Sequence, residues 1–304
     1  MLLNFFCLFL MMILSLISVA FITLLERKLL GFIQVRKGPT KVGVFGIFQP
    51  FSDAVKLFTK EFYCPLSINF YPYWLSPVLA LGISILSWVV FPYGFHLVSW
   101  KYTILFMFCL MSLSVYTIVI SGWFSNSCYS VIGAIRSIAQ SVSYEVSFFL
   151  MILAVLYFIS SMNFLIFLKF QKMIWFIFLL FPVFLMFFVS FLAELNRTPF
   201  DFSEGESELV SGFNIEYGGS GFAFIFLAEY LSIIFSSLII VIFFFCSCLN
   251  YFFYLKLMFM SFMILVIRSM LPRYRYDKLM NMCWKSYLSS ILCLIIFYSS
   301  ISTV

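Results

Sequence analysis

Charge is what this sequence most lacks. Only 10% of its 304 residues are Asp, Glu, Lys or Arg, whereas 64% are hydrophobic. Soluble domains carry about 25% charged residues. A water-soluble fold of this length could not bury so much apolar surface, so lipid must surround most of the chain. The shortage of charge excludes a soluble protein and indicates an integral membrane protein.

Ligands for redox centres are also scarce. His96 is the only histidine, which excludes a haem held by two histidines. The eight cysteines are scattered, apart from Cys246 and Cys248, and no C-x-x-C pair exists, so no iron–sulfur or zinc ligand set is visible. Neither nucleotide-binding glycine motif occurs. We therefore expect the chain to bind no metal and no redox cofactor, and to contain no residue that catalyses through a covalent intermediate.

Long uncharged stretches are abundant. Eight stretches could cross the roughly 30 Å of hydrocarbon in a bilayer, within residues 1–25, 66–100, 102–135, 146–168, 173–193, 221–248, 252–271 and 286–304. The sixth is interrupted only by Glu229, and the seventh holds Lys256 and Arg268 near its ends, where both can reach the interface. Seven or nine spans are the alternatives. The first stretch lacks the basic start and the cleavage site of a secretory signal, so we interpret it as a retained span. The sequence predicts an all-α integral membrane protein of about eight helices, forming a single domain over residues 1–304.

The charged residues are distributed unevenly between the connections. We call the connections 26–65, 124–143, 194–221 and 272–285 the inner loops. Fourteen of the 18 Lys and Arg lie in or beside them, and the remaining four are Lys101, Lys169, Lys172 and Lys256. The positive-inside rule then places these loops on the inner side of the membrane and both termini on the outer side. This bias explains the net charge of +6 without a nucleic-acid partner.

The first inner loop contains an amphipathic pattern. Its apolar side chains recur every three or four residues, at Ile47, Phe48, Phe51, Ala54, Val55, Phe58 and Phe62, and its charged ones lie on the opposite stripe, at Asp53, Lys56 and Lys60. This spacing predicts a helix that lies in the membrane interface. The helix could be a surface anchor alone, or a lip past which an amphiphile enters from the lipid.

The third inner loop is rich in acids. It carries Glu194, Asp201, Glu204, Glu206, Glu208 and Glu216 against a single base, Arg197. Apolar residues alternate with these acids, which predicts that the loop packs and that several carboxylates are partly desolvated. Desolvation and like-charge crowding raise carboxylate pKa values, so such a row could pass protons near neutral pH. An ordinary solvated acidic loop remains the alternative.

Glu229 is the most informative single residue. It lies about eight residues, or roughly 12 Å, into the sixth expected span, where a carboxylate costs on the order of 2.5–3.5 kcal/mol. A buried partner, Arg136 or Arg197, could offset this cost. A water-filled path shared with Glu194 and Glu145 could also do so.

Several segments together resemble one family. They are ERKLLGFIQVRKGP at 26–39, QPFSDAVKLFTKE at 49–61, IRSIAQSVSYEV at 135–146, AELNRTPFDFSEGESELVSGFNIEY at 193–217, AEY at 228–230 and PRYRYDKLM at 272–280. They resemble the chain 1 family of mitochondrial NADH–ubiquinone oxidoreductase, respiratory complex I. The resemblance covers nearly the whole chain, and the motif at 193–217 is long enough to be highly specific.

The resemblance implies a function. The chain would be a core membrane-arm subunit of a proton-pumping complex in the mitochondrial inner membrane, with its inner loops facing the matrix and both termini in the intermembrane space. It would form the access chamber for the substrate ubiquinone beneath the peripheral arm. NADH, FMN and iron–sulfur clusters would bind to partner subunits, and the partners would be other membrane-arm and peripheral-arm quinone-site subunits and lipids.

The resemblance also implies site residues. The quinone chamber would be lined from Arg27, Arg36, Asp53, Arg136, Phe224 and Arg275. The proton path would use Glu145, Glu194, Asp201, Glu204, Glu206 and Glu229. Leu195 and Ser203 depart from the residues expected at those positions, but neither is ionisable. Three alternatives are less consistent with the sequence. A stand-alone transporter would need two repeated halves with broken helices, which the sequence lacks, and a purely structural anchor would not need Glu229. A hydrogenase-type membrane subunit is a closer alternative than these two, but the mitochondrial-style motifs favour the quinone enzyme.

Overall fold

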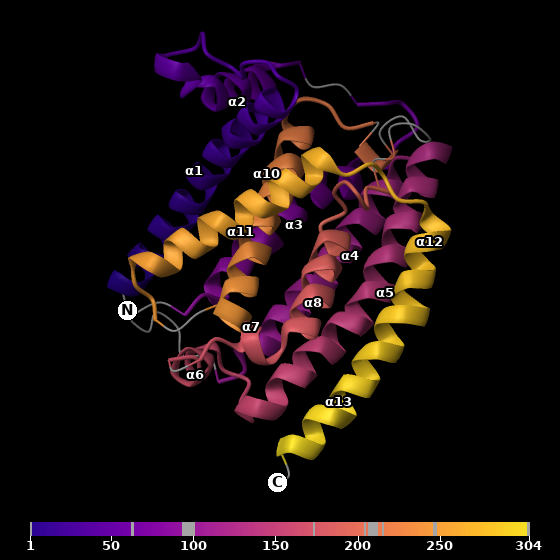
Figure 1. The fold of residues 1–304 in the computed structure, drawn as a ribbon. Helices are drawn as coiled ribbons and strands as arrows, with labels where there is room; N and C mark the ends of the chain where they lie inside the picture. Colours follow the sequence, from indigo (N-terminus) through magenta and orange to yellow (C-terminus); the bar gives the residue numbers. More distant parts are fainter. Residues whose placement is uncertain are drawn as a thin grey trace.

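The fold is a bundle of long helices, seen in a computed structural model that describes residues 2–61, 64–92, 101–172, 174–203, 205, 212–214, 216–245 and 248–302. These ranges contain helices and no strand, which confirms the all-α class. The long helices are α1 (Leu2–Ile33), α3 (Phe70–Ser87), α4 (Thr103–Phe124), α5 (Cys128–Ile159), α10 (Gly219–Ile240) and α11 (Tyr251–Met270), shown in Figure 1. A last long helix comprises α12 (Tyr276–Asn281), a π-helical stretch and α13 (Leu288–Ser302).

Seven helices in the described ranges are long and apolar enough to cross a membrane. The span expected at 173–193 differs, because it consists of the short α7 (Phe176–Leu179) and the 14-residue α8 (Phe181–Glu194). Pro182 lies in the first turn of α8, where proline is well tolerated because the first N–H groups of a helix have no partner within it. Both ends of the chain lie at the same end of the bundle, as an even number of passes requires (Figure 1).

The second inner loop, expected at 124–143, is mostly helix. Only Ser125–Ser127 separate α4 from α5, which ends at Ile159 before the left-handed Ser160. The expected fourth span, 146–168, is thus shifted toward the N-terminus, and Glu145 lies inside a helix rather than at its start. The sequence suggested a loop because this stretch is polar. Its polar residues are buried against protein, as the fully buried Ser137 and Gln140 illustrate.

The predicted interfacial helix is present as α2 (Gln49–Thr59). A left-handed Gly46 precedes it, where a side chain would clash with the Pro39 carbonyl. The apolar side chains of α2 meet two long helices, since Phe51 contacts Phe21 of α1 and Phe58 contacts Phe224 of α10. In Figure 1, α2, the start of α5 and the link from α11 to α12 lie at one end of the bundle, opposite both termini. We call this the α2 end.

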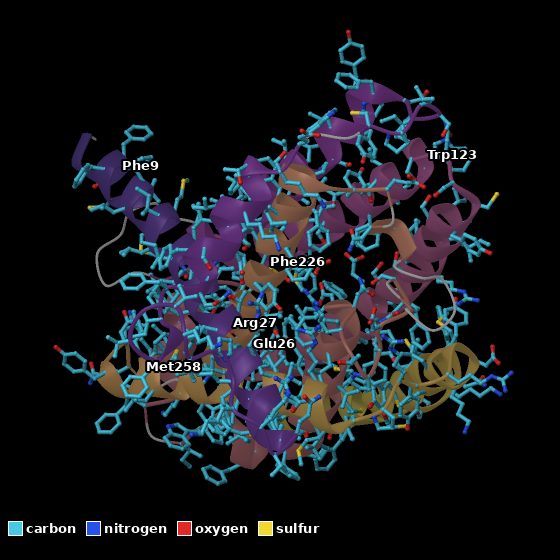
Figure 2. All side chains as sticks on the ribbon, turned by 90° about the horizontal axis from the view of Figure 1, so that it is seen from above. Phe9, Glu26, Arg27, Trp123, Phe226 and Met258 are labelled. Atoms are coloured by element: carbon cyan, nitrogen blue, oxygen red, sulfur yellow. The ribbon has the colours of Figure 1, made fainter. Side chains whose placement is uncertain are left out.

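The core is built around α5, α8 and α10. Stacked and edge-on aromatic rings fill it, with Phe187 of α8 in contact with Phe148 of α5 and with Phe243 beyond α10. Side chains on α1, α4 and α11 project outward at the rim, for example Phe9, Trp123 and Met258 (Figure 2). Lipid would cover this apolar rim, so the polar groups that remain inside need partners from the protein.

Candidate functional site

A cavity of about 170 Å³ lies between α3, α4, α8 and α10. Hydroxyl side chains from α3 and α4 line one wall, namely Ser76, Ser84, Ser87, Ser114, Thr117 and Ser121. Each donates to a carbonyl three residues earlier in its own helix, so an oxygen is left to accept hydrogen bonds from the cavity. The wall therefore suits molecules that donate hydrogen bonds, such as water.

Two carboxylates, Glu194 and Glu229, line the same cavity. Glu194 is the last residue of α8, and Glu229 lies in the first half of α10. The sequence analysis predicted that these two acids share one path, and the fold does bring them to one space. Asn196 also lines the cavity, and its Oδ1 atom is buried without a hydrogen-bond partner among the described residues. A buried oxygen of this kind needs a donor, and water in the cavity could supply it.

One explanation for Glu229 within a span was a buried cation as its partner, and Arg197 is that cation. Arg197 forms an ion pair with the Oε2 atom of Glu229, and only 4% of the Arg197 side chain is exposed. The Arg197 guanidinium also lies over the rings of Phe226 and Tyr230, 5.5 Å and 5.1 Å from their centroids. Glu229 is consequently both paired with Arg197 and in contact with the cavity.

The turn that presents Arg197 is fixed from several sides. The Gln140 side chain on α5 donates to the carbonyls of Ala193, at 2.6 Å, and Phe200, at 3.0 Å. Thr198 donates to the Arg268 carbonyl at the end of α11. Because an unpaired buried carbonyl is costly, these bonds stabilise the irregular backbone between α8 and the acidic loop.

A second buried ion pair lies close by. Glu26, near the end of α1, pairs with Arg268 of α11 through its Oε1 atom. Its Oε2 atom accepts a hydrogen bond of 2.7 Å from the Tyr230 hydroxyl. Glu26 is buried, and its neighbour in sequence, Arg27, is exposed; Figure 2, which looks down on the molecule from above, labels both on α1.

The expected chamber residues gather partly around α2. Arg27 pairs with Asp53, which also accepts a hydrogen bond of 3.0 Å from Gln49. Phe224 lies on α10 with its ring centroid 5.9 Å from that of Phe58, beside the interfacial helix as expected. Arg36 lies in the exposed segment before α2 and donates to Gln34.

The other expected residues lie further from α2. Arg136 is half-buried on α5. Arg275 is exposed, follows α11 and pairs with Asp277 at 2.9 Å, so it does not join the α2 group. Asp201 is buried and lies 3.6 Å from Arg273.

Glu145 is half-buried on α5, close enough to Glu194 for the two charges to interact. Glu204 and Glu206 lie outside the described residues, as do Glu208 and His96.

The end of the third inner loop is held against α3 by two stacked tyrosines. The rings of Tyr73 and Tyr217 are 4.3 Å apart and nearly parallel. The Tyr217 hydroxyl lies 2.8 Å from Ser76 Oγ, which lines the cavity. Burial raises the pKa of Tyr217 to about 12, so its hydroxyl keeps its proton at neutral pH.

The sequence analysis missed three features of this site. The pair Glu26–Arg268 was overlooked because both residues lie near span ends, where charged side chains normally reach water. Tyr230 was overlooked because a tyrosine in an apolar span looks like core. The hydroxyl wall did leave a signal, since Ser114, Thr117 and Ser121 recur at helical spacing. Within the described ranges, no cluster of three or more His, Cys, Asp or Glu side chains could hold a metal ion.

Comparisons with known proteins give consistent matches. The sequence model of a family described as NADH dehydrogenase matches residues 6–299. A protein of Anopheles gambiae named NADH-ubiquinone oxidoreductase chain 1 is 52% identical over 290 residues, which cover 95% of this chain and 92% of that protein. The proteins of the same name from Locusta migratoria and Sminthopsis macroura are 53% and 45% identical. These matches cover 97% and 94% of this chain, and 94% and 92% of those proteins.

Proposed function

Because the chain belongs to the NADH dehydrogenase family and is a membrane subunit of an NADH–ubiquinone oxidoreductase, we propose that it forms the quinone-access chamber and the first part of the proton path of that complex. The assembled complex would transfer two electrons from NADH to ubiquinone, which takes up two protons to become ubiquinol. FMN and iron–sulfur clusters on partner subunits would carry the electrons.

The α2 end provides the chamber in this proposal. The quinone would enter from the lipid past α2, whose exposed Phe51, Val55 and Phe58 offer an apolar surface to its tail. Arg27, Arg36 and Asp53 would meet the polar head group, with Phe224 on the inner wall. Arg136 and Arg275 would line the chamber further toward the peripheral subunits. The contacts of α2 with both α1 and α10 support this assignment, because they leave α2 lying across the ends of the two helices.

The cavity provides the proton path. Protons would move through water between Glu194 and Glu229, with Glu145 beside Glu194. Asp201, Glu204 and Glu206 would connect the path to the quinone chamber. Hydroxyl oxygens that accept hydrogen bonds, together with the unpaired Asn196 Oδ1 atom, favour ordered water in this space.

Electrostatic repulsion links the two parts. Reduction makes the quinone transiently anionic until it has taken up protons, and this negative charge acts on the acids of the third inner loop. Two like charges 4 Å apart repel by about 4 kcal/mol at an effective dielectric constant of 20. An energy of this size is enough to change the protonation of a nearby carboxylate and to displace protons along the path.

The proposal also assigns the surroundings of the chain. The complex would lie in the mitochondrial inner membrane, with the α2 end facing the matrix and the peripheral quinone-site subunits. Both termini would face the intermembrane space, where the excess of basic residues is absent. Other membrane-arm subunits and lipids would cover the apolar rim.

The observation that carries the proposal is the placement of Glu194 and Glu229 in one cavity. Its test is Glu229→Gln in the assembled complex, which removes one charge and preserves the shape of the side chain. We expect the complex to assemble and its quinone-linked proton pumping to fall at least tenfold, measured in proteoliposomes.

Glu61→Gln serves as the control, because Glu61 is an exposed acid that does not line the cavity. Pumping and quinone reduction at wild-type rates in the Glu229 variant would refute the proton role.

A further inference from the structure

Tyr230 lies between the two buried ion pairs and touches both. Its hydroxyl donates to Glu26, whose other oxygen pairs with Arg268. Its ring lies under the guanidinium of Arg197, which pairs with Glu229. Only 5% of Tyr230 is exposed, so these contacts replace water on both sides of the ring.

We propose that Tyr230 is a positioning residue that couples the charge state of the Glu26–Arg268 pair to the position of Arg197 on Glu229. This inference rests on the proposed function, because it assumes that Glu229 takes part in proton movement. It adds a residue that is neither an acid of the path nor a lining residue of the cavity.

The position of Tyr230 on α10 explains how it can connect the two pairs. Neighbouring residues of an α-helix point about 100° apart, so Glu229 lines the cavity while Tyr230 faces α1 and α11. The Tyr230 hydroxyl reaches α1 at Glu26, and its ring supports the cation that holds Glu229. One side chain therefore contacts both sides of α10.

The other end of this connection lies next to α2. Glu26 precedes Arg27 on α1, and Arg27 pairs with Asp53 of α2. Glu26 is buried between α1, α10 and α11, whereas the Arg27 side chain is exposed beside α2; both are labelled in Figure 2. A change at the α2 end thus has a continuous path of contacts, through α1, Tyr230 and Arg197, to the carboxylate at the cavity.

The chemistry of the contacts suits such a coupling. A hydrogen bond to a carboxylate is roughly twice as strong as one between neutral groups, and its strength depends on the charge of the acceptor. When Arg268 moves away from Glu26, or Glu26 loses its charge, the bond to Tyr230 changes. The ring then turns and the guanidinium above it shifts relative to Glu229. Coupling of this kind requires packed groups with two discrete arrangements, which these contacts can provide.

Tyr230→Phe tests the inference, because it removes the hydroxyl and keeps the ring under Arg197. The measurement is the number of protons that the complete complex moves per electron pair in proteoliposomes. The rate of NADH oxidation with a hydrophilic electron acceptor, which does not need the quinone site, reports how much complex has assembled. We expect the proton-to-electron ratio to fall at least twofold. A merely structural role would lower quinone reduction and pumping together and leave the ratio unchanged.

Glu26→Gln provides a second, independent variant, because it removes the charge but keeps an oxygen that can accept from Tyr230. We expect the same fall in the ratio. Tyr298→Phe is the matched control, since Tyr298 is an equally buried tyrosine on α13, packed against Phe158. It should keep the wild-type ratio.

The outcomes separate this inference from its premise. If Glu229→Gln lowers pumping while both Tyr230→Phe and Glu26→Gln keep the wild-type ratio, the role of Tyr230 is refuted and the proton path stands. If Glu229→Gln also pumps normally, the proposed function fails and this inference fails with it. Should the Tyr230 variant fail to assemble, the ratio in Glu26→Gln alone decides.

Discussion

At the scale of the residue, the burial of Glu229 inside a membrane-spanning helix carries an energetic cost that the fold must offset. An ionised carboxylate inside a membrane costs on the order of 2.5–3.5 kcal/mol, and the chain offsets this with Arg197, which comes from the irregular turn after α8. The arginine is itself held by aromatic rings and by the hydrogen bonds of its turn. Removing Arg197 leaves Glu229 as an uncompensated charge, whereas Arg197 without Glu229 keeps its contacts with the rings of Phe226 and Tyr230.

Arg197→Gln should destabilise the subunit by about 3–5 kcal/mol, the usual cost of leaving a buried ion without its partner. We expect a lower yield of assembled complex on native gels and a lower temperature of thermal inactivation. The double variant Arg197→Gln with Glu229→Gln should recover part of this loss, because no unpaired charge remains. A double variant as unstable as the sum of the two single ones would contradict this account.

At the scale of the element, α2 differs from the spans because it is a short helix whose apolar side chains are largely exposed. Asp53 of α2 pairs with Arg27 of α1, and about half of the Arg27 side chain is exposed. Exposed ion pairs of this kind contribute only about 0–1 kcal/mol to stability. Aromatic contacts also attach α2 to α1 and to α10. A weakly attached helix can shift on its neighbours, which suits an entrance for a lipid-soluble substrate.

Asp53→Asn should therefore leave the stability of the complex almost unchanged and yet raise the KM for quinone severalfold. The reason is that the Arg27 pair positions α2 without contributing much to folding. Steady-state kinetics with a short-chain quinone and the assembled amount on native gels measure the two effects separately. Glu61→Gln, which removes an acid from the same loop, should alter neither. A loss of assembly in step with the rise in KM would show that the pair is structural.

At the scale of the whole molecule, the bundle separates its polar chemistry from its apolar rim. α10 is mostly buried by the other helices, whereas α1 and the final helix present most of their surface to the outside. The cavity and both buried ion pairs lie beside α10, and α2 covers one end of the bundle. This arrangement gives the two ends of the molecule different chemistry and predicts a fixed orientation in the membrane.

Two exposed cysteines can report that orientation. Cys128 begins α5 at the α2 end, and Cys248 follows α10 at the opposite end. In variants that keep Cys128 or Cys248 as the only cysteine of the chain, a membrane-impermeant maleimide should label Cys248 in mitoplasts and Cys128 in inverted inner-membrane vesicles. Labelling of both cysteines from the same side would contradict the orientation proposed from the basic residues.

The class of fold and the amphipathic helix α2 followed from the sequence alone, which also singled out Glu194 and Glu229, the two acids that the structure places at one cavity. Long uncharged runs leave a chain no alternative to helices in lipid, because every backbone donor and acceptor must be satisfied within the segment. The spacing of Phe51, Val55 and Phe58 was sufficient for α2 because a one-sided apolar stripe is a local property.

The tertiary structure alone decided the length of α5, the break between α7 and α8, and the partners of the buried charges. Ser137 and Gln140 read as loop residues because hydropathy cannot tell a polar side chain facing water from one facing protein. The contacts of Arg197 with Glu229, and of Arg268 with Glu26, join residues from separate helices and turns. Partners so far apart in the chain leave no local signal, since only the packing of the helices brings them together.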